Sequence, residues 1–308
     1  MKKLTILIPA YNEEKAICKC LESIIKQNDL QDVNITISVI ANHCNDDTVD
    51  VVQRYINSKN LKSIDIYNIQ ERGKSKALNY GLKNIKTDYF AVMDADCVLE
   101  ENCVRKIVAE FENNKKLKIV GALDKPLFKE TKSLLYEYQV TQQIYREERG
   151  RVLPVGRFYM FEGNLIEEFP EFLHSEDTWL DLHIASAYGW NAVKVLMEAI
   201  VYFTPAQNWI DFIKQESRFE CGLPQIINHF PKLLQVWENR RRSSQVEYSK
   251  KKVFERITQR LQNMNINESR ITEFDSIIAD IIEDNSKIMR YDLISKDGIW
   301  EPINSTKG

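Results

Sequence analysis

The sequence predicts an α/β protein with a Rossmann-like mixed sheet flanked by helices, followed by a helical C-terminal subdomain. Three observations support this prediction. Short apolar runs rich in β-branched residues alternate with segments of helical periodicity through the first third of the chain. Polar clusters stand where the expected strands end. From residue 223 to residue 297 there is no glycine, which favours helix in the tail.

The expected strands of the first half cover residues 4–8, 33–41, 64–69 and 89–93. Between them, residues 13–26 place apolar side chains at helical spacing, Asp46-Asp47 opens a second helix, and residues 75–82 begin a third. Because strands and helices alternate with short links, we expect a parallel sheet with right-handed connections.

The second half is less regular. We expect strands within residues 155–166 and 191–203, and helices at residues 176–188 and 209–230, the latter broken near Gly222-Leu223-Pro224. An apolar helical stripe continues in the tail, at Phe274, Ile277, Ile278, Ile281 and Ile282. The predicted division is a sheet domain over residues 1–229 and a helical extension over residues 230–308.

Composition and charge are those of an ordinary globular protein. Hydrophobic residues make up 44% and charged residues 28%, and the net charge of −3 gives no reason to expect nucleic acid as a partner. The six cysteines form no CxxC pair, so we interpret them as reduced, mostly buried thiols. The first apolar run ends at Pro9, too early for a signal peptide, and no stretch approaches the ~20 apolar residues that span a bilayer. We therefore expect a cytoplasmic protein whose membrane contact, if any, is peripheral at the inner face.

Three polar clusters are expected to meet at one rim of the sheet. They follow the first, second and fourth strands, at residues 10–13, 42–47 and 94–96. In parallel α/β sheets, ligands sit beyond the carboxyl ends of the strands. The convergence of these clusters predicts a ligand site at that rim.

Asp94-Ala95-Asp96 stands at the end of the fourth expected strand. Two carboxylates one residue apart in a turn can both approach one cation. Hard carboxylate oxygens suit Mg²⁺ or Mn²⁺, which usually also bind substrate phosphates. The competing interpretation is that Asp96 caps a helix beginning near Val98. Taken alone, the two aspartates do not decide between these interpretations.

Five further motifs accompany this triplet. In chain order the six read Pro9-Ala10-Tyr11-Asn12-Glu13-Glu14, Ala41-Asn42-His43-Cys44-Asn45-Asp46-Asp47-Thr48, Arg72-Gly73-Lys74-Ser75-Lys76-Ala77-Leu78-Asn79, Met93-Asp94-Ala95-Asp96, Ser175-Glu176-Asp177-Thr178-Trp179-Leu180 and Gln215-Glu216-Ser217-Arg218-Phe219. As an ordered set they resemble the inverting, family 2 glycosyltransferases with a GT-A fold. The fifth looks like that family's Glu-Asp motif. The sixth looks like a variant of its Gln-x-x-Arg-Trp motif, with Phe219 in place of Trp.

The resemblance implies a role for each matched position. Asp96 would be the main metal ligand, with Asp94 beside it and leaning towards the ribose. Asn42 would face the base, and Arg218 would neutralise the leaving diphosphate. The implied nucleotide-sugar-binding residues are Pro9, Ala10, Tyr11, Glu13, Asn42, Arg72, Lys76, Asp94, Ala95, Gln215 and Arg218. The implied acceptor region holds Gly163, Asn164 and Phe219, and turn formation competes as an explanation of Gly163-Asn164.

Asp177 is the candidate general base, with Glu176 as its catalytic neighbour. An acceptor hydroxyl must lose its proton as it attacks the anomeric carbon, and a carboxylate within hydrogen-bond reach can take that proton. A metal would stabilise the charge gathering on the departing diphosphate. The competing interpretation is that both acids cap the helix at residues 176–188. On the residues alone the two are equally supported, and the whole motif set favours the base.

The favoured function is therefore an inverting transfer of a sugar from a nucleotide-diphosphate donor of UDP type, with Mn²⁺ or Mg²⁺, to a hydroxyl of a glycan, lipid-linked or protein acceptor. An alternative is a catalytically inactive sugar-nucleotide-binding or scaffold module, against which the intact acids argue. A nucleotidyltransferase ranks last, because the acids at residues 13 and 14 would repel a triphosphate. The basic clusters at residues 240–242 and 250–252 are expected to be a solvated helix face or, as a minority reading, a contact with anionic lipid headgroups.

Overall fold

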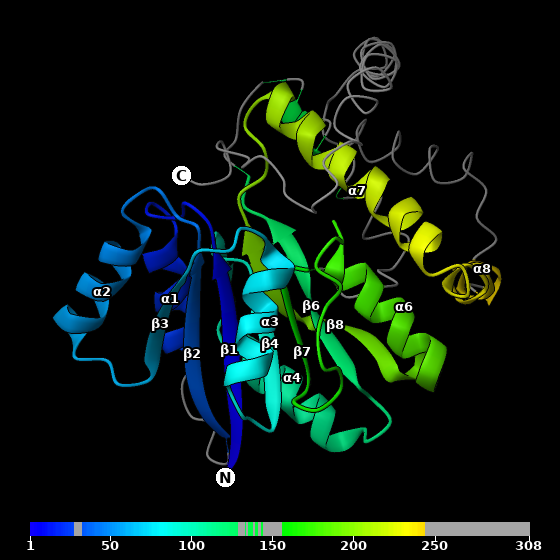
Figure 1. The fold of residues 1–308 in the computed structure, drawn as a ribbon, viewed down its shortest axis with the longest axis horizontal. Coiled ribbons are helices and arrows are strands. Elements are labelled where there is room, and N and C mark those ends of the chain that lie inside the picture. Colours follow the sequence, from blue (N-terminus) through cyan, green and yellow to red (C-terminus); the bar gives the residue numbers. More distant parts are fainter. Residues whose placement is uncertain are drawn as a thin grey trace, which may run out of the picture.

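The computed structural model describes residues 1–27, 33–128, 133, 135–137, 139, 140, 143 and 156–243. Their core is one mixed sheet of eight strands in the order β3-β2-β1-β4-β7-β6-β8-β5 (Figure 1). The predicted Rossmann-like mixed sheet flanked by helices is thereby confirmed.

The first half of the sheet is parallel, as predicted. It contains β1 (Lys2–Ala10), β2 (Val33–Asn42), β3 (Ile64–Ile69) and β4 (Tyr89–Met93). β1 lies in the middle, paired with β2 on one side and with β4 on the other. The carboxyl ends of these strands therefore point to one rim, which is the arrangement that the polar clusters require.

Helices cover both faces of the sheet (Figure 1). Apolar residues of α1 (Ile17–Ile25), α2 (Thr48–Lys59) and α4 (Cys103–Asn113) pack into the core on one face. Those of α3 (Lys74–Asn84) and α6 (Glu176–Tyr188) pack into the core on the other. The predicted positions of α2, α3 and α6 are confirmed.

The start of α1 differs from the prediction. We expected helix from Glu13, but α1 begins at Ile17. The carbonyl of Glu13 accepts the amides of Ala16 and Ile17 in a tight turn, and the Glu13 amide donates to the Thr48 hydroxyl at 2.7 Å. The Glu13 backbone is thus bound to the first residue of α2, and α1 begins only after this turn.

The second half of the sheet is mixed, with β6 and β8 parallel to each other and β7 and β5 running in the opposite direction. It contains β5 (Cys97–Leu99), β6 (Ile119–Pro126), β7 (Phe158–Glu162) and β8 (Val193–Phe203). β7 runs antiparallel to both β4 and β6, and β5 runs antiparallel to the end of β8. The strands expected within residues 155–166 and 191–203 are confirmed.

β5 settles one competing interpretation. Asp96 does not cap a helix, because a strand follows it at Cys97 and the next helix, α4, begins at Cys103 after Asn102. The sheet order places β5 four strands from β4, about 19 Å away at the ~4.8 Å spacing of a flat sheet. Only three residues join the two strands, and they reach about 14 Å. The sheet must therefore curl, which brings its far edge back over the Asp94–Asp96 turn.

The helix expected at residues 209–230 is α7 (Trp209–His229), and the predicted break near Gly222 is wrong. α7 continues through Pro224 as one helix. Gly222 instead allows α7 to pack closely against Ser175, the residue before α6, because a Cβ at position 222 would collide with the Ser175 hydroxyl. A short 3-10 turn (Trp190–Ala192) precedes β8, and α8 (Leu233–Ser243) follows α7.

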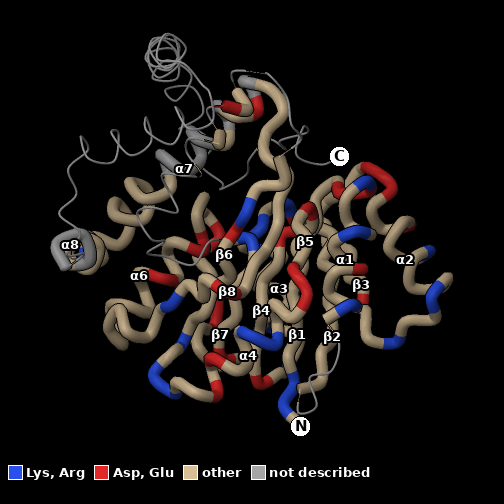
Figure 2. The backbone as a smooth tube through the Cα atoms, turned by 180° about the vertical axis from the view of Figure 1, so that it is seen from behind, with Lys and Arg blue, Asp and Glu red and all other residues tan. Residues whose placement is uncertain are grey.

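The rest of the expected extension, including its apolar stripe and the basic cluster at residues 250–252, lies outside the described residues, and the boundary at residue 230 stays a prediction. Within the described part, acidic and basic positions are interspersed (Figure 2). No described helix combines the length and the apolar character needed to cross a membrane. The described cysteines are free thiols; Cys20, Cys97 and Cys103 are buried, while Cys18 and Cys44 are half-buried.

Candidate active site

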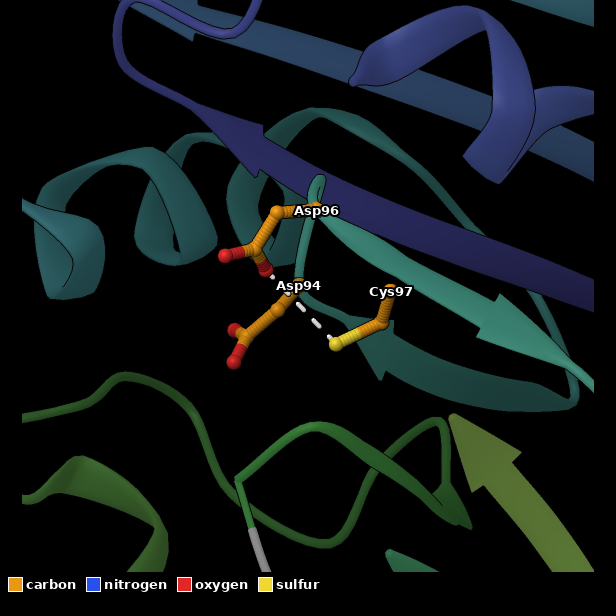
Figure 3. Close-up of side chains that lie close together, drawn as sticks. All are labelled: Asp94, Asp96 and Cys97. Carbon is orange, nitrogen blue, oxygen red and sulfur yellow. Dashed lines mark hydrogen bonds between the residues drawn. The ribbon is translucent and has the colours of Figure 1, made fainter. Parts of the chain in front are cut away.

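The Asp94–Asp96 turn follows β4 directly, and backbone hydrogen bonds hold both of its ends. The Asp94 amide donates to the Arg157 carbonyl at 3.0 Å, and the Cys97 amide donates to the Asp94 carbonyl at 3.2 Å. Figure 3 shows both carboxylates on the same side of the turn, with the Cys97 thiol pointing towards them. One ligand atom from each of Asp94, Asp96 and Cys97 lies within 4.8 Å of the others.

The chemistry of this cluster fits a hard divalent cation. Burial, reinforced by the charges of Asp96 and Asp94, raises the pKa of Cys97 well above its usual range, so the thiol stays protonated. Its sulfur lies 3.6 Å from Asp96 Oδ1, to which it donates. The two carboxylates are therefore the candidate ligands, and oxygen donors suit Mn²⁺ or Mg²⁺.

Lys74, the first residue of α3, joins this turn to the start of α6. Its ammonium lies 2.7 Å from Asp94 Oδ1 and 2.8 Å from Glu176 Oε1, and it also donates to the Gly156 carbonyl at 3.3 Å. Burial opposes its charge, but Asp94, Glu176 and Asp177 outweigh burial and raise the pKa of Lys74. Two predicted motifs, some eighty positions apart in the chain, thus share one cation.

Sequence reasoning did not single out Lys74 as a site residue. One signal was present. A lysine in the first turn of a helix faces the positive end of the helix dipole, where acidic residues are preferred. A lysine placed there needs nearby carboxylates to offset the unfavourable interaction with the dipole, and Asp94 and Glu176 are those carboxylates.

Glu176 and Asp177 are the first two residues of α6. The preceding Ser175 makes no side-chain cap, and the Glu176 carboxylate turns to Lys74 instead of to the helix end. Burial, followed by the charge of Glu176, raises the pKa of Asp177 to about 6, while Lys74 acts in the opposite direction. A carboxyl that titrates near neutral pH suits a general base.

Gly156 and Arg157 complete the junction, and sequence reasoning missed both roles. A Cβ on Gly156 would lie 2.6 Å from Asp177 Oδ2, so a side chain at this position would displace the Asp177 carboxylate. The Arg157 guanidinium pairs with the fully buried Asp124 at 2.9 Å and stacks on the Phe203 ring at 3.7 Å. Neither pattern is local in sequence, because the contacts come from β6, β8 and α6.

The predicted nucleotide side of the rim is built from the loops after β1, β2 and β3. The Arg72 guanidinium stacks over the Tyr11 ring at 4.7 Å. Asn42 is buried, and its amide donates to the Ala10 carbonyl at 3.0 Å while its oxygen accepts from the Gly73 amide at 3.3 Å. Asn42 therefore joins the three loops, a bridging position that the expectation of a base-facing side chain did not include.

The loops after β1 and β2 also clasp each other directly. Asn12 and Asn45 exchange hydrogen bonds, from Asn12 Nδ2 to Asn45 Oδ1 at 2.5 Å and from the Asn45 amide to Asn12 Oδ1 at 2.9 Å. The Glu14 amide donates to Asp46 at 3.2 Å, and the Asp47 amide donates back to Glu14 at 3.0 Å. These hydrogen bonds, between Asn12 and Asn45 and between Glu14 and Asp46/Asp47, hold the two loops together beside Tyr11.

Gly163 and Asn164 do not belong to this rim, and their assignment to the acceptor region is corrected. β7 runs antiparallel to β4, so Arg157 lies beside Asp94 while the Gly163 amide donates to Asp88, before the start of β4. Gly163 is therefore at the opposite end of β4, six residues along β7 from Arg157 and about 20 Å from Asp94 at ~3.3 Å per residue. A Cβ there would collide with the Thr87 carbonyl, so close packing explains the glycine.

The remaining predicted residues are placed as follows. Pro9 is the second-last residue of β1, before Ala10, and Lys76 lies partly exposed in the first turn of α3. Ala95 is buried in the core beneath the turn. Gln215 lies on α7. The side chains of Arg218 and Phe219, on the same helix, are outside the described residues, so their roles stay predictions.

Solved structures identify the fold class. The chain is similar to the mannosyltransferase PcManGT from Pyrobaculum calidifontis, solved in complex with GDP-Man and Mn²⁺, with a TM-score of 0.62, 14% identity, and coverage of 93% of this chain and 83% of that one. It is also similar to residues 1–349 of Staphylococcus aureus TarS in complex with UDP, with a TM-score of 0.50, 18% identity, and coverage of 70% and 64%. The curled mixed sheet is thus the GT-A glycosyltransferase fold.

Sequence comparison gives the family. Residues 5–163 match the family model described as glycosyl transferase family 2, and residues 89–263 match the one described as glycosyl transferase family group 2. The chain belongs to glycosyl transferase family 2.

Curated relatives match over part of their length. A Methanococcus voltae dolichyl N-acetyl-α-D-glucosaminyl phosphate 3-β-D-2,3-diacetamido-2,3-dideoxy-β-D-glucuronosyltransferase is 24% identical over 199 residues, which are 60% of this chain and 62% of the relative. A Staphylococcus epidermidis teichoic acid poly(glycerol phosphate) polymerase is 34% identical over 119 residues, 37% of this chain and 15% of the relative. The chain thus spans less than two thirds of the length of these relatives.

Proposed function

We propose that this chain transfers a sugar from a nucleotide-diphosphate donor of UDP type to an acceptor hydroxyl, with inversion and with dependence on Mn²⁺ or Mg²⁺. The observation that carries the proposal is the junction at Lys74. It brings Asp94, on the predicted donor side, and Glu176, beside the predicted base, to within 3 Å of one ammonium. Donor and acceptor chemistry need this proximity, because both act on one anomeric carbon.

The proposed reaction is a single displacement. The acceptor oxygen attacks the anomeric carbon while the bond from that carbon to the diphosphate oxygen breaks, and the hydroxyl proton passes to Asp177. The raised pKa of Asp177, about 6, supports this role, since the group is ionised at neutral pH yet accepts a proton readily. A divalent cation held by Asp96 and Asp94 would supply positive charge for the departing diphosphate.

The comparisons support a UDP-type donor and an acceptor that is lipid-linked or polymeric. TarS was solved with UDP. The name of the M. voltae relative contains a dolichyl sugar phosphate, and that of the S. epidermidis relative contains a poly(glycerol phosphate). PcManGT was solved with GDP-Man, so a panel of donors must include both nucleotides.

The test is donor hydrolysis and transfer, followed with and without Mn²⁺ across that panel. Asp96→Ala is expected to lower the rate by about 10²-fold or more and to remove the response to Mn²⁺. Asp177→Asn is expected to lower transfer by about 10²–10⁴-fold, because the base is lost, while UDP binding persists.

Asp65→Asn is the matched control, since Asp65 is exposed on β3 away from the rim. It is expected to retain wild-type rates. Full activity and an undiminished response to Mn²⁺ in Asp96→Ala would contradict the proposed metal site. Tight UDP binding without turnover in the wild type, over the whole acceptor panel, would favour the binding-module alternative.

A further inference from the structure

Lys74 occupies the position between two carboxylates that the proposed function assigns to different halves of the reaction. Its ammonium contacts Asp94 Oδ1 at 2.7 Å and Glu176 Oε1 at 2.8 Å. The Asp94 carboxylate is also part of the cluster, with Asp96 and Cys97, whose geometry fits a divalent cation. The Asp94 carboxylate therefore contacts the Lys74 ammonium and would also be a ligand of a divalent cation bound at this cluster.

The local structure holds Lys74 in this position against the preference of its helix. Gly73, directly before α3, has a φ of 134°, which side-chain-bearing residues rarely adopt, and it directs the chain so that Lys74 enters the rim. The helix dipole disfavours a cation in the first turn. The contacts with Asp94, Glu176 and the Gly156 carbonyl offset that cost.

Resting on the proposed function, we propose that Lys74 is the counter-ion of the donor-free site. Lys74 neutralises Asp94 in the donor-free site. It would release Asp94 to a divalent cation bound with the nucleotide and would keep its contact with Glu176. Donor binding would thereby change the charge balance beside Asp177. Lys74 is in this view a positioning residue that links the donor and acceptor carboxylates.

The proposal predicts opposite effects for two residues in contact. Lys74→Met removes the competitor, so Mn²⁺ should bind about fivefold more tightly. Glu176→Gln leaves Lys74 with Asp94 as its remaining charged partner in this bridge, so Mn²⁺ should bind about threefold more weakly. A merely structural role for Lys74 would instead weaken Mn²⁺ binding on its removal, because a distorted turn holds a cation less well.

Lys83→Met is the matched control. Lys83 lies in the last turn of the same helix, carries the same charge and pairs with Glu168 at 3.1 Å. If contact with Asp94 matters and not the charge of the helix, Lys83→Met should leave the Mn²⁺ affinity within about twofold. Lys74→Arg keeps a cation at the position and should bind Mn²⁺ as the wild type does, within about twofold.

The experiment is Mn²⁺ titration of the full chain, followed by electron paramagnetic resonance without nucleotide and by calorimetry with UDP. Transfer kinetics of Lys74→Met accompany it, with kcat expected to fall about tenfold or more and donor KM to change less than threefold.

The outcomes separate the two proposals. A wild type that binds neither Mn²⁺ nor UDP overturns the proposed function, and this inference with it. A wild type that binds both, with Lys74→Met binding Mn²⁺ no more tightly, overturns this inference alone. Should Lys74→Met fail to fold, Glu176→Gln decides: weaker Mn²⁺ binding supports the counter-ion role, and unchanged or tighter binding refutes it.

Discussion

At the scale of single residues, the raised pKa of Asp177 predicts how kcat/KM depends on pH. With a pKa of about 6 in the free protein, kcat/KM should fall as the pH drops below 6 and should be about tenfold below its plateau at pH 5, because the base is then protonated. A pH–rate profile in the presence of Mn²⁺ measures this. If kcat/KM fell only below pH 4.5, the assignment of Asp177 as the general base would be contradicted.

Stability provides the control for this prediction. The pKa of Asp177 is higher in the folded chain, about 6, than the ordinary 3.8. The folded state therefore holds the proton more tightly, and stability falls as the pH rises through that interval. Asp177→Asn should accordingly raise the unfolding temperature at pH 8 but not at pH 4, while its residual activity loses the acidic limb.

The residues that sequence reasoning found and missed differ in how local their signals are. Asp94, Asp96, Glu176 and Asp177 stand in short motifs at element ends, so their position at the rim follows from the order of strands and helices. Gly156 and Arg157 gain their roles from elements that are distant in the chain. Gly163 was misassigned because the sequence does not reveal that β7 runs antiparallel, which turns this glycine to the far end of the sheet.

At the scale of elements, Asn79 fastens α3 to the segment that leads into α6. Its side chain donates to the Phe169 carbonyl at 2.9 Å and accepts the Phe169 amide at 2.7 Å, and both residues are buried. Asn79→Ala leaves two buried backbone groups unpaired. It should lower the free energy of unfolding by about 2–3 kcal/mol, measured by urea denaturation.

Asn84→Ala provides the comparison on the same helix. Asn84 is exposed, and its side chain donates to the Tyr80 carbonyl at 2.8 Å, which water can replace. Its substitution should change the free energy of unfolding by less than about 0.5 kcal/mol. Equal effects of the two substitutions would show that the buried pair with Phe169 does not hold α3.

Element types were more predictable than element ends. β-branched runs and helical periodicity gave the strands and helices of the first half, because these patterns reflect burial on one or two faces. The predicted start of α1 was wrong because the Glu13 amide is bound to Thr48, the first residue of α2. The continuity of α7 was missed because Gly222 has a packing reason for being glycine, and local propensity predicts a break there.

At the scale of the whole molecule, we expect the metal to contribute to nucleotide binding and not to the stability of the free fold. In the free chain the charge of Asp94 is already balanced by Lys74, so EDTA should leave the unfolding temperature unchanged within about 1 °C. UDP with Mn²⁺ should raise it by about 5 °C at ligand concentrations near 100 times Kd, because ligand binds the folded state only.

EDTA should abolish that increase. Scanning calorimetry or dye-based thermal unfolding measures each condition, and Asp96→Ala with Mn²⁺ and UDP is the control that should show no increase. A large loss of stability on adding EDTA alone would indicate a structural metal and would contradict the counter-ion role of Lys74.

The pairing of β5 with β8 also constrains how the chain folds. Cys97 lies beside Phe203, so the strand that leaves the Asp94–Asp96 turn finds its partner roughly a hundred residues later. During synthesis the parallel strands β1 to β4 can assemble while this turn still lacks its second anchor. We expect a nascent chain that ends before β8 to form a compact intermediate without affinity for the nucleotide, so the capacity to bind a donor is acquired late in folding.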